Sequence, residues 1–399
     1  MKIHIIQHGL KDKSAHEFPE LIGWKQLFFD QKQEHYIYCH SSAPTEWQEK
    51  YDVIPSFNLI PEHTFAAPEG LTELYDFCEK SRHFGLACQN IDGKNLQADD
   101  LIIVSYALEA EIYGVAQWLQ TLPKNKQPFV AFIIHRQHFA TKLSEDKKSI
   151  SVPEGYYNLA ANALREAYSE FKTAVFTLNN NRLAQYIHQT TQLPCYPIPY
   201  HIESHKLQSR KAIPTIYDIS FIGQYRPERG TQLIPQIINQ LLTVLPTKKI
   251  FLQVTEAYEY ENVAAWFFKI GSPKNLIIHY GSLERQSFIE IIQQSKLIVL
   301  AYYWQRYLMR SSGVFADAVS LAKPTVIPAQ SLMVDQIKAV KGAAVAFNSF
   351  SEASITQAII QAISQIEQLT IQAQIASQNW QKENSPNQAI NVIKAKLGM

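Results

Sequence analysis

The sequence predicts two tandem α/β domains, each with a mostly parallel, doubly wound sheet covered by helices on both faces. Three observations support this fold class. The chain has 399 residues, which is too long for one ordinary core. Short apolar runs alternate with longer segments of helical period. The alternation stops at a proline-rich polar stretch, residues 194–218, and then starts again, which indicates a linker.

Five strands are expected in the first half, because each run is rich in Ile, Val, Phe and Tyr and ends at polar or Gly/Pro residues. The segments 111–122 and 155–171 between them carry apolar residues three and four apart, as helices that cover a sheet do. Continuously apolar strands between such helices are typical of a parallel sheet. The expected strands are residues 2–9, 35–40, 100–106, 129–135 and 173–179.

The second half repeats this pattern and then ends in helical segments that have no strand between them. We therefore expect an N-terminal domain at residues 1–203, a C-terminal domain at 204–375, and a terminal helix at 376–399 that packs back on the first domain. The expected strands are 218–225, 248–255, 275–281, 296–303 and 323–329; the expected helices are 230–245, 284–294, 313–322, 351–369 and 378–397.

Composition and charge narrow the class of protein. Hydrophobic residues make up 46% and charged residues 18%, which is typical of a soluble globular chain. Lys+Arg 37 against Asp+Glu 36 leaves a net charge of +1, which argues against a nucleic-acid partner. The four cysteines have no metal-ligand spacing, and no apolar run approaches the ~20 residues that span a bilayer. A cytoplasmic protein is expected, and peripheral contact with the inner face of a membrane stays open.

Ligands of doubly wound sheets bind outside the carboxyl ends of the strands, here expected in the cleft between the domains. In the first domain the polar residues at such ends follow the strand 2–9 or close the strand 129–135. An ordinary strand-to-helix turn is the alternative for the first of these places, and a capped strand-end histidine is the alternative for the second. The candidates are His8, Gly9 and His16 as acceptor-side contacts, and Asp12, Glu17 and His135 as catalytic groups.

The segment GQYRPERG, residues 223–230, is the stronger signal in the second domain. The strand ends at Gly223, and Arg226 and Arg229 precede Gly230 and a helix. Two guanidinium groups beside helix N-terminal amides suit a diphosphate. The alternative, a solvated loop, does not require two arginines between two glycines.

The segment RSSGVFADAVSLAKPTVIP, residues 310–328, supplies a second anion-binding turn. Its small residues form the first turn of a helix, whose amides can bind phosphate, and an arginine adds positive charge. A carboxylate one helical turn further could accept both hydroxyls of a ribose. A short turn at residues 281–282 could border a planar base. The residues are Arg310, Ser311, Ser312 and Gly313 for the diphosphate, and Asp317, Gly281 and Ser282 for the ribose and base.

The arginine-containing turn, the short turn at 281–282 and the helix start with its carboxylate follow one another along the chain. In that order, the features of residues 217–365 resemble the donor-binding domain of GT-B glycosyltransferases, in particular the retaining, family-4-like group 1 enzymes. The resemblance implies two Rossmann-like domains with a cleft between them. It also implies that Arg226 and Arg229 hold the donor diphosphate and that Asp317 holds the ribose. The first half resembles that family in pattern only. Gly9 follows the first strand, and His135 stands where the family often has a strand-end histidine near the donor sugar.

One position departs from that family. Met309 stands eight residues before Asp317, where the Glu-x7-Glu motif has its first glutamate. The stereochemical outcome and the donor sugar therefore stay open; an inverting enzyme would need a base, for which Asp12 or Glu17 is the first candidate. A catalytically degenerate partner of an active glycosyltransferase and a nucleotide-sugar 2-epimerase are the alternatives.

The resemblance implies a hexosyltransferase-type enzyme of polysaccharide biosynthesis that needs no metal and no other cofactor. Its partners would be a nucleotide-diphosphate sugar donor and a glycan, lipid-linked or protein acceptor. The sequence does not identify the sugar, base, acceptor, linkage or oligomeric state.

Overall fold

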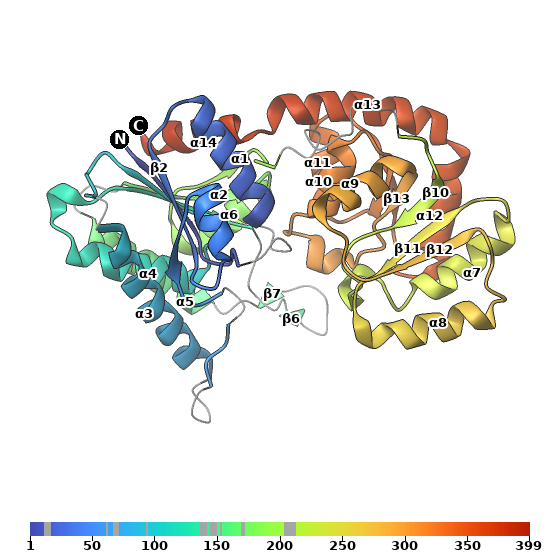
Figure 1. Ribbon diagram of the computed structural model, residues 1–399, viewed down its shortest axis with the longest axis horizontal. Coiled ribbons are helices and arrows are strands. Elements are labelled where there is room, and N and C mark those ends of the chain that lie inside the picture. Colours follow the sequence, from blue (N-terminus) through green and yellow to red (C-terminus); the bar gives the residue numbers. More distant parts are fainter. Residues whose placement is uncertain are drawn as a thin grey trace. The chain divides into compact units, whose positions relative to one another are not determined.

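The computed structural model describes residues 1–11, 17–60, 63–66, 72–92, 95–135, 142–143, 150–151, 154–168, 172–202 and 213–399 (Figure 1). Its contacts divide the chain into two compact units, residues 1–202 with 386–399, and residues 203–385. The sequence places the boundaries after residues 203 and 375. The contacts place the second boundary after residue 385, because the helix that ends at Glu383 packs on the second unit, where Ser377 Oγ donates to Ser320 O at 2.7 Å.

The first unit is built on a seven-stranded sheet in the order β3-β2-β1-β4-β5-β8-β9, and all neighbouring strands are parallel. Ile5 in the centre pairs with Ile37 on one side and Ile103 on the other. The strands are β1 (Ile3–Gln7), β2 (His35–His40), β3 (Val53–Phe57), β4 (Leu101–Val104), β5 (Phe129–Ile134), β8 (Thr173–Leu178) and β9 (Cys195–Ile198); β6 (Lys142–Leu143) and β7 (Ile150–Ser151) form a separate antiparallel pair.

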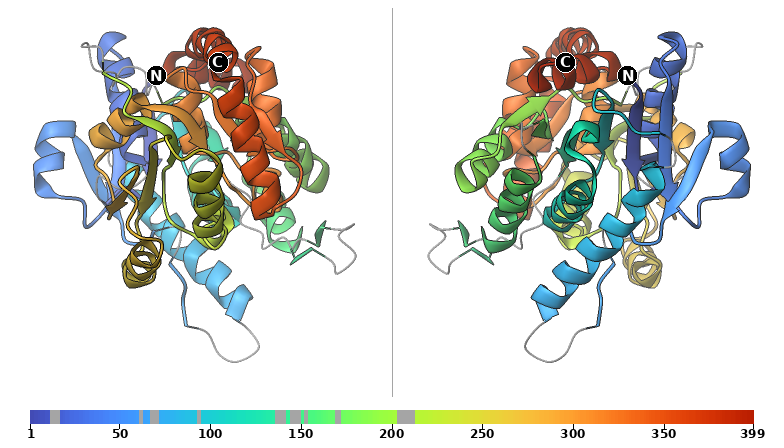
Figure 2. Two further views of the ribbon diagram at one scale, coloured as in Figure 1. Left: turned by 90° about the vertical axis from the view of Figure 1, so that its right-hand side faces the viewer. Right: turned by 90° about the vertical axis from the view of Figure 1, so that its left-hand side faces the viewer.

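Helices cover both faces of this sheet (Figures 1 and 2). The helices α3, α4, α5 and α6 contact one another in succession along one face, whereas α1 contacts α14 on the other. The helices are α1 (Glu17–Asp30), α2 (Thr45–Tyr51), α3 (Thr72–Asp92), α4 (Glu109–Thr121), α5 (Glu154–Ala167), α6 (Asn181–Thr191) and α14 (Pro386–Leu397), with a 3₁₀ turn η1 (Lys124–Lys126).

The second unit has a six-stranded parallel sheet in the order β12-β11-β10-β13-β14-β15. Its strands are β10 (Tyr217–Phe221), β11 (Ile250–Val254), β12 (Leu276–Tyr280), β13 (Ser295–Val299), β14 (Thr325–Pro328) and β15 (Val345–Phe347). Its helices are α7 (Ile234–Val244), α8 (Tyr260–Lys269), α9 (Arg285–Gln294), α10 (Gly313–Ser320), α11 (Leu332–Ala339), α12 (Glu352–Ser364) and α13 (Ile366–Glu383), with 3₁₀ turns η3 (Pro227–Arg229), η4 (Ala257–Glu259) and η5 (Trp304–Tyr307).

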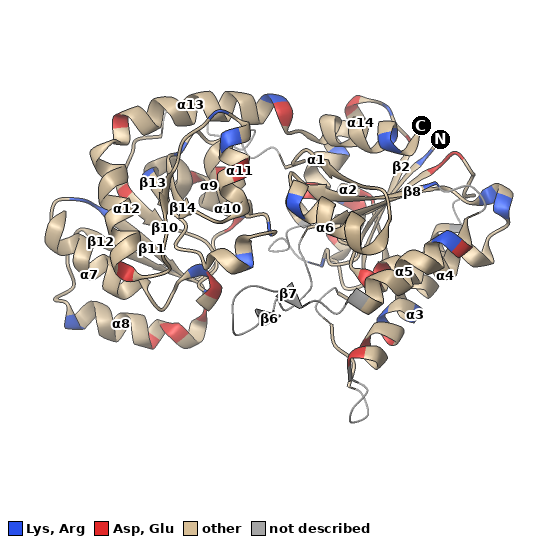
Figure 3. Cartoon of the chain, turned by 180° about the vertical axis from the view of Figure 1, so that it is seen from behind, with Lys and Arg blue, Asp and Glu red and all other residues tan. Residues whose placement is uncertain are grey.

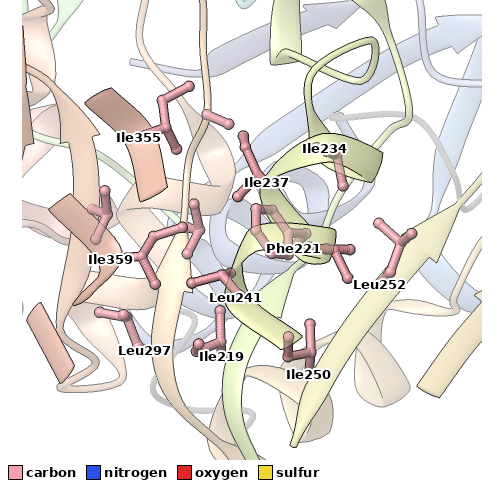
Figure 4. Close-up of a cluster of buried hydrophobic side chains, with 14 of the residues drawn as sticks. Ile219, Phe221, Ile234, Ile237, Leu241, Ile250, Leu252, Leu297, Ile355 and Ile359 are labelled. Atoms are coloured by element: carbon pink, nitrogen blue, oxygen red, sulfur yellow. The ribbon is translucent and has the colours of Figure 1, made fainter. Parts of the chain in front are cut away.

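One apolar core cluster of the second unit lies between its sheet and helices that include α7 and α12 (Figure 4). The strand residues are apolar and fully or almost fully buried, and α7 and α12 supply isoleucine and leucine against them. Burial of this apolar area is the main stabilising contribution. The side chains labelled in the figure are Ile219, Phe221, Ile234, Ile237, Leu241, Ile250, Leu252, Leu297, Ile355 and Ile359.

The predicted pair of doubly wound, Rossmann-like domains is confirmed. The linker prediction is wrong at its start, because Cys195–Ile198 forms β9, an edge strand that tolerates Pro197. In each sheet the strand order reverses at one place, between β1 and β4 in the first unit and between β10 and β13 in the second. Loops at the carboxyl ends of these strands are where such folds bind ligands.

Lys and Arg are interspersed with Asp and Glu along the helices of both units (Figure 3). This mixture accords with the net charge of +1. Within the described residues, no helix combines the length and the apolar character needed to cross a bilayer.

Candidate functional site

In the second unit, one glutamine connects the turns that follow two strands. The Gly223 N–H donates to Gln253 Oε1 at 2.9 Å, and Gln253 Nε2 donates to Gly281 O at 3.1 Å. Gln253 lies on β11 and is only 4% exposed. Both glycines have positive φ angles, +113° and +107°. The spacing of the two turns is therefore set by a buried side chain, which the sequence signals only as one polar residue in the apolar run of β11.

Arg229 lies against the first of these turns. Its Nη1 is 2.7 Å from the place a Cβ would occupy on Gly223, so a side chain there would collide with the guanidinium. Gly230 follows in the left-handed region at φ +77°, and a Cβ on it would lie 2.1 Å from Ala301 O. The two glycines thus let η3 pack on the carboxyl end of β13, which brings Arg229 to the strand-order reversal.

Two arginines contact the two rings of one stacked tyrosine pair. The Cζ of Arg229 is 5.5 Å from the ring centroid of Tyr302, and the Cζ of Arg310 is 5.6 Å from that of Tyr307. The two rings stack with centroids 4.3 Å apart. Cation–π contacts of this length hold a guanidinium over a ring. Arg229 and Arg310, 81 positions apart in sequence, are thereby brought to one cluster, and sequence reasoning missed both tyrosines.

The electrostatics of this cluster keep Arg229 cationic. Burial lowers the pKa of Arg229, but the phenol oxygens of Tyr302 and Tyr307 raise it, and the net pKa lies above the ordinary value. Burial raises the pKa of Tyr302 to about 12, although the Arg229 charge opposes that rise. The Nε of Arg229 is buried and has no hydrogen-bond partner in the described part of the chain. A buried N–H of this kind suits an anionic ligand.

The N-terminus of α10 follows the cluster directly. Ser312 is the N-cap, and its Oγ accepts a hydrogen bond from the Phe315 N–H at 3.2 Å. The first N–H groups of a helix have no intrahelical acceptor, so those of Gly313 and Val314 point to the space before the helix. Ser311 is half-buried in the preceding loop. The predicted anion-binding turn is therefore a properly capped helix start.

Asp317, one turn into α10, forms a bidentate ion pair with Arg285. Nη1 of Arg285 donates to Oδ2 at 2.7 Å, and Nη2 donates to Oδ1 at 2.6 Å. Asp317 is 5% exposed, and Arg285 is the first residue of α9. The sequence analysis missed Arg285, which holds the orientation of the predicted ribose-binding carboxylate.

This ion pair should be energetically coupled. We expect Asp317→Asn and Arg285→Met each to lower the free energy of unfolding by about 1–3 kcal/mol, because each leaves a partly buried partner without its counter-charge. The double variant should lose about 1–2 kcal/mol less than the sum of the singles. Urea unfolding measures all four proteins. The control is the exposed pair Lys296–Asp218, with Nζ 2.9 Å from Oδ1, whose coupling should stay below about 1 kcal/mol. Additive losses at Arg285 and Asp317 would contradict the assignment.

The remaining candidates of the second unit lie in the neighbouring loops. Arg226 is half-buried and extended at the start of η3, where its carbonyl accepts from the Arg229 N–H at 2.8 Å. Ser282 is exposed before α9. Met309 is half-buried just before Arg310. All these positions follow β10, β12 or β13. The predicted donor-side residues therefore lie at the carboxyl ends of the strands of the second sheet.

In the first unit, His8 follows β1 and pairs with a glutamate that the sequence analysis missed. His8 Nε2 is 3.4 Å from Glu111 Oε1, and the two side chains are 1% and 6% exposed. Glu111 Oε2 accepts from the Leu108 N–H at 3.0 Å. Burial raises the pKa of Glu111, but the His8 ring and the Leu108 N–H lower it, so that the net pKa lies below the ordinary value. The pair lies where the order of the first sheet reverses.

His135, which follows β5, contacts a second buried carboxylate. Its Nε2 is 3.4 Å from Glu20 Oε1, and His201 Nε2 is 3.3 Å from Glu20 Oε2. Gln7 Nε2 donates to the same carboxylate at 3.5 Å. Glu20 is 1% exposed, whereas the His135 side chain keeps 14% exposure. One glutamate of α1 therefore positions the histidine that the sequence predicts at a strand end.

The other first-domain candidates lie along the segment that follows β1 in the sequence. Asp12 and His16 lie outside the described residues, as does the side chain of Glu17, which opens α1. Gly9 is buried in the turn after β1. His8 and His135 come from β1 and β5, which flank β4 in the sheet.

Two tandem Rossmann-like domains with ligand-facing loops at the strand ends define the GT-B class of folds. Solved structures of that class match this chain over its whole length. HepE of Anabaena, solved with UDP and glucose, has 12% identity and a TM-score of 0.61, covering 100% of this chain and 98% of HepE. TarM has 8% identity and a TM-score of 0.68, covering 100% and 99%. WaaG, a glycosyltransferase involved in lipopolysaccharide biosynthesis, has 11% identity and a TM-score of 0.58, covering 100% of both chains.

At these identities the likeness establishes the fold, and it confirms the predicted resemblance to GT-B glycosyltransferases. No family profile matches the sequence. No curated protein matches it either.

Proposed function

We propose that this protein is a glycosyltransferase that moves a sugar from a nucleotide-diphosphate donor to a hydroxyl-bearing acceptor. The observation that carries the proposal is the position of Arg229, between the Gly223 turn and the Tyr302 ring at the strand-order reversal of the second sheet. The fold supports it, because structural neighbours were solved with UDP, with UDP-glucose, and with UDP beside a GlcNAc-glycerol.

The donor half of the mechanism follows from the charges of the cluster. Breaking the bond between the anomeric carbon and the diphosphate oxygen places negative charge on the leaving group. Arg229, Arg310 and Arg226, with the amides at the start of α10, supply a preorganised positive potential for that charge, as an oxyanion hole does. We propose that no metal and no other cofactor is required, because the guanidinium groups fill this role.

The nucleoside would be held by the neighbouring loops. Asp317, oriented by Arg285, would accept the ribose hydroxyls, and the turn of Gly281 and Ser282 would border the base. The bond to the diphosphate oxygen breaks as the new bond joins the anomeric carbon to the acceptor oxygen, and the acceptor proton passes to the departing diphosphate. A retaining outcome in polysaccharide biosynthesis, at the cytoplasmic side of a membrane, is part of the proposal.

The test of this function is a thermal-shift panel of nucleoside diphosphates and nucleotide sugars on the full chain. A ligand that binds only the folded state stabilises it by RT ln(1 + [L]/Kd), about 2.7 kcal/mol at one hundred times Kd, and so raises the melting temperature. At least one nucleoside diphosphate should raise it, and no response to any would contradict the proposal. Incubation with the labelled donor then separates the alternatives: an epimerase changes the sugar without an acceptor, and an inactive partner binds without turnover.

Asp317→Ala should weaken UDP binding about tenfold and leave pyrophosphate binding nearly unchanged. The reason is that the lost carboxylate accepts ribose hydroxyls, which pyrophosphate lacks, and one charged hydrogen bond is worth ~1.5–3 kcal/mol. Titration calorimetry with both ligands measures the difference. The control is Asp218→Ala, because Asp218 lies near the amino end of β10, away from the carboxyl ends of the strands. Equal losses for both ligands would show that Asp317 does not bind the ribose.

A further inference from the structure

The edge strand β12 of the second sheet differs from the other edge strands in how open it is to pairing. The two large sheets of the described chain have four edge strands, β3, β9, β12 and β15. A proline interrupts β3 and another interrupts β9, and β15 has only three residues; both features limit pairing with a further strand. β12 has five residues, and the sequence from Asn275 to Leu283 contains no Pro, Lys, Arg, Asp or Glu. Its free edge is therefore a template for one more strand.

The hydrogen bonds between β12 and β11 show which backbone groups lie along this free edge. Asn275 O accepts from an N–H of β11 at 2.8 Å, and the Gly281 N–H donates to a carbonyl of β11 at 2.8 Å. Alternate residues of a strand bond to the same neighbour, so the odd-numbered residues from 275 to 281 bond to β11. The N–H and C=O groups of Ile278 and Tyr280 therefore point away from β11, and no described strand pairs with them.

The helix α8 borders the free edge on one face of the sheet. It joins β11 to β12, and Val263 belongs to the core cluster that contains residues of both strands. Trp266 Nε1 donates to Asn239 Oδ1 of α7 at 3.2 Å, so this side of α8 faces α7 and the centre of the sheet. Residues two positions apart lie on opposite sides of a helix. Ala264 and Phe268 therefore face the free edge, and Phe268 is 81% exposed.

A second copy of this chain fits the free edge better than a single peptide strand does. A two-fold axis beside Ile278 would pair two β12 strands antiparallel, with Tyr280 of one copy opposite the second copy's Leu276. The two α8 helices would lie on the same face about two strand spacings, ~10 Å, apart, which is the interaxial distance of packed helices. Ala264 is small enough for that approach, and the second α8 would cover Phe268, which a lone peptide would leave exposed.

The charges along the free edge are also complementary to a second copy. α8 has Glu261 in its first turn and Lys269 in its last, and Figure 3 shows this division along the helix. Lys274, just before β12, adds to the basic end, whereas Arg285 at the acidic end is already paired with Asp317. Antiparallel pairing brings the basic end of each copy towards the acidic end of the other, which favours association.

We propose that this protein forms a two-fold symmetric homodimer through the β12 edge and the side of α8 that carries Ala264 and Phe268. The dimer joins the two six-stranded sheets into one continuous sheet. This inference does not rest on the proposed glycosyltransferase function.

Sedimentation velocity of the full chain, from about 1 μM to about 100 μM, tests the association. The unchanged chain should sediment as a dimer in the upper part of this range. Ile278→Pro removes the N–H that pairs across the two-fold axis, and because both copies carry the change, association should weaken at least about a hundredfold. Its pairing with β11 should persist, since the Ile278 N–H points away from β11, and circular dichroism checks the fold. The matched control is Ile278→Ala, which loses the same side chain but keeps the N–H and should associate within about fivefold of the unchanged chain.

Cysteine cross-linking locates the interface without the proline variant. Ala264→Cys places two thiols beside the two-fold axis, where helices ~10 Å apart bring them within disulfide reach. Mild oxidation should then give a covalent dimer. Asn262→Cys, which is also exposed but on the opposite side of α8, should give no more covalent dimer than the unchanged chain, whose exposed Cys78 sets the background.

A chain that stays monomeric throughout the concentration range would overturn the proposal. A dimer in which Ala264→Cys forms no more disulfide than Asn262→Cys would also overturn it, because the copies would then meet at another surface. Full association of a folded Ile278→Pro chain would contradict it in the same way. Because UDP affinity enters none of these outcomes, failure of either proposal leaves the other in place.

Discussion

Arg229→Ala is expected to weaken the binding of UDP at least tenfold and to leave the fold intact. Arg229 is cationic, has a buried Nε without a hydrogen-bond partner among the described residues, and lies against the Gly223 turn. Loss of a charged hydrogen bond costs ~1.5–3 kcal/mol, and about 1.4 kcal/mol is a factor of ten in affinity. The substitution leaves the apolar cluster between β10, α7 and α12 unchanged, so the chain should still fold. Titration calorimetry gives the affinity, and circular dichroism checks the fold.

Two controls make this result specific. Lys296→Ala removes one positive charge from the same unit at the amino end of β13, and it should leave UDP affinity within about twofold because solvent and salt screen distant charges. Arg229→Lys keeps the charge but loses the planar guanidinium group. Its UDP affinity should therefore lie between those of Arg229→Ala and Lys296→Ala. Unchanged UDP affinity in Arg229→Ala would remove the diphosphate assignment.

Gly230→Ala should give the largest loss of stability, about 2–5 kcal/mol in the free energy of unfolding. The residue has φ +77°, where a Cβ costs roughly 1–2 kcal/mol, and that Cβ would lie 2.1 Å from Ala301 O. Backbone must shift to relieve the contact, and overpacking of this kind costs typically ~1–3 kcal/mol more. Urea unfolding of the variant measures the sum.

Gly271→Ala is the matched control for the backbone angle. Gly271 has φ +80°, but no atom lies within 4 Å of the place of its Cβ. Its loss should therefore be about 1–2 kcal/mol, from strain alone. If the two variants lose equal stability, close packing of η3 on β13 is not what requires glycine at position 230.

The predicted elements were those with the strongest patterns. Long apolar strands in the sheet centres, such as β1 and β5, are apparent from the sequence because both faces are covered. The edge strands β3 and β9 were missed because each contains proline, Pro55 and Pro197, and is only partly buried. Proline argues against a strand unless the strand lies at an edge or a bulge, and position in the sheet is not visible in the sequence.

In the second unit, the pattern of strands and loops is enough to predict which segments approach the candidate site. Gly223, Arg229 and the start of α10 all follow strands, and parallel strands end at one edge of a sheet. That rule brings their loops together without any knowledge of side chains. The order of the strands and the positive φ angles of Gly223 and Gly230 came only with the structure.

The partners of these residues were decided only by the tertiary structure. Arg285 with Asp317, Tyr302 with Arg229, and His8 with Glu111 are 32, 73 and 103 positions apart, and no local pattern connects them. Each pair forms because sheet order places two loops side by side and burial removes the water that would otherwise solvate the charges. A single sequence records the residue types that such pairs need, but the distance between two loops is a property of the folded chain.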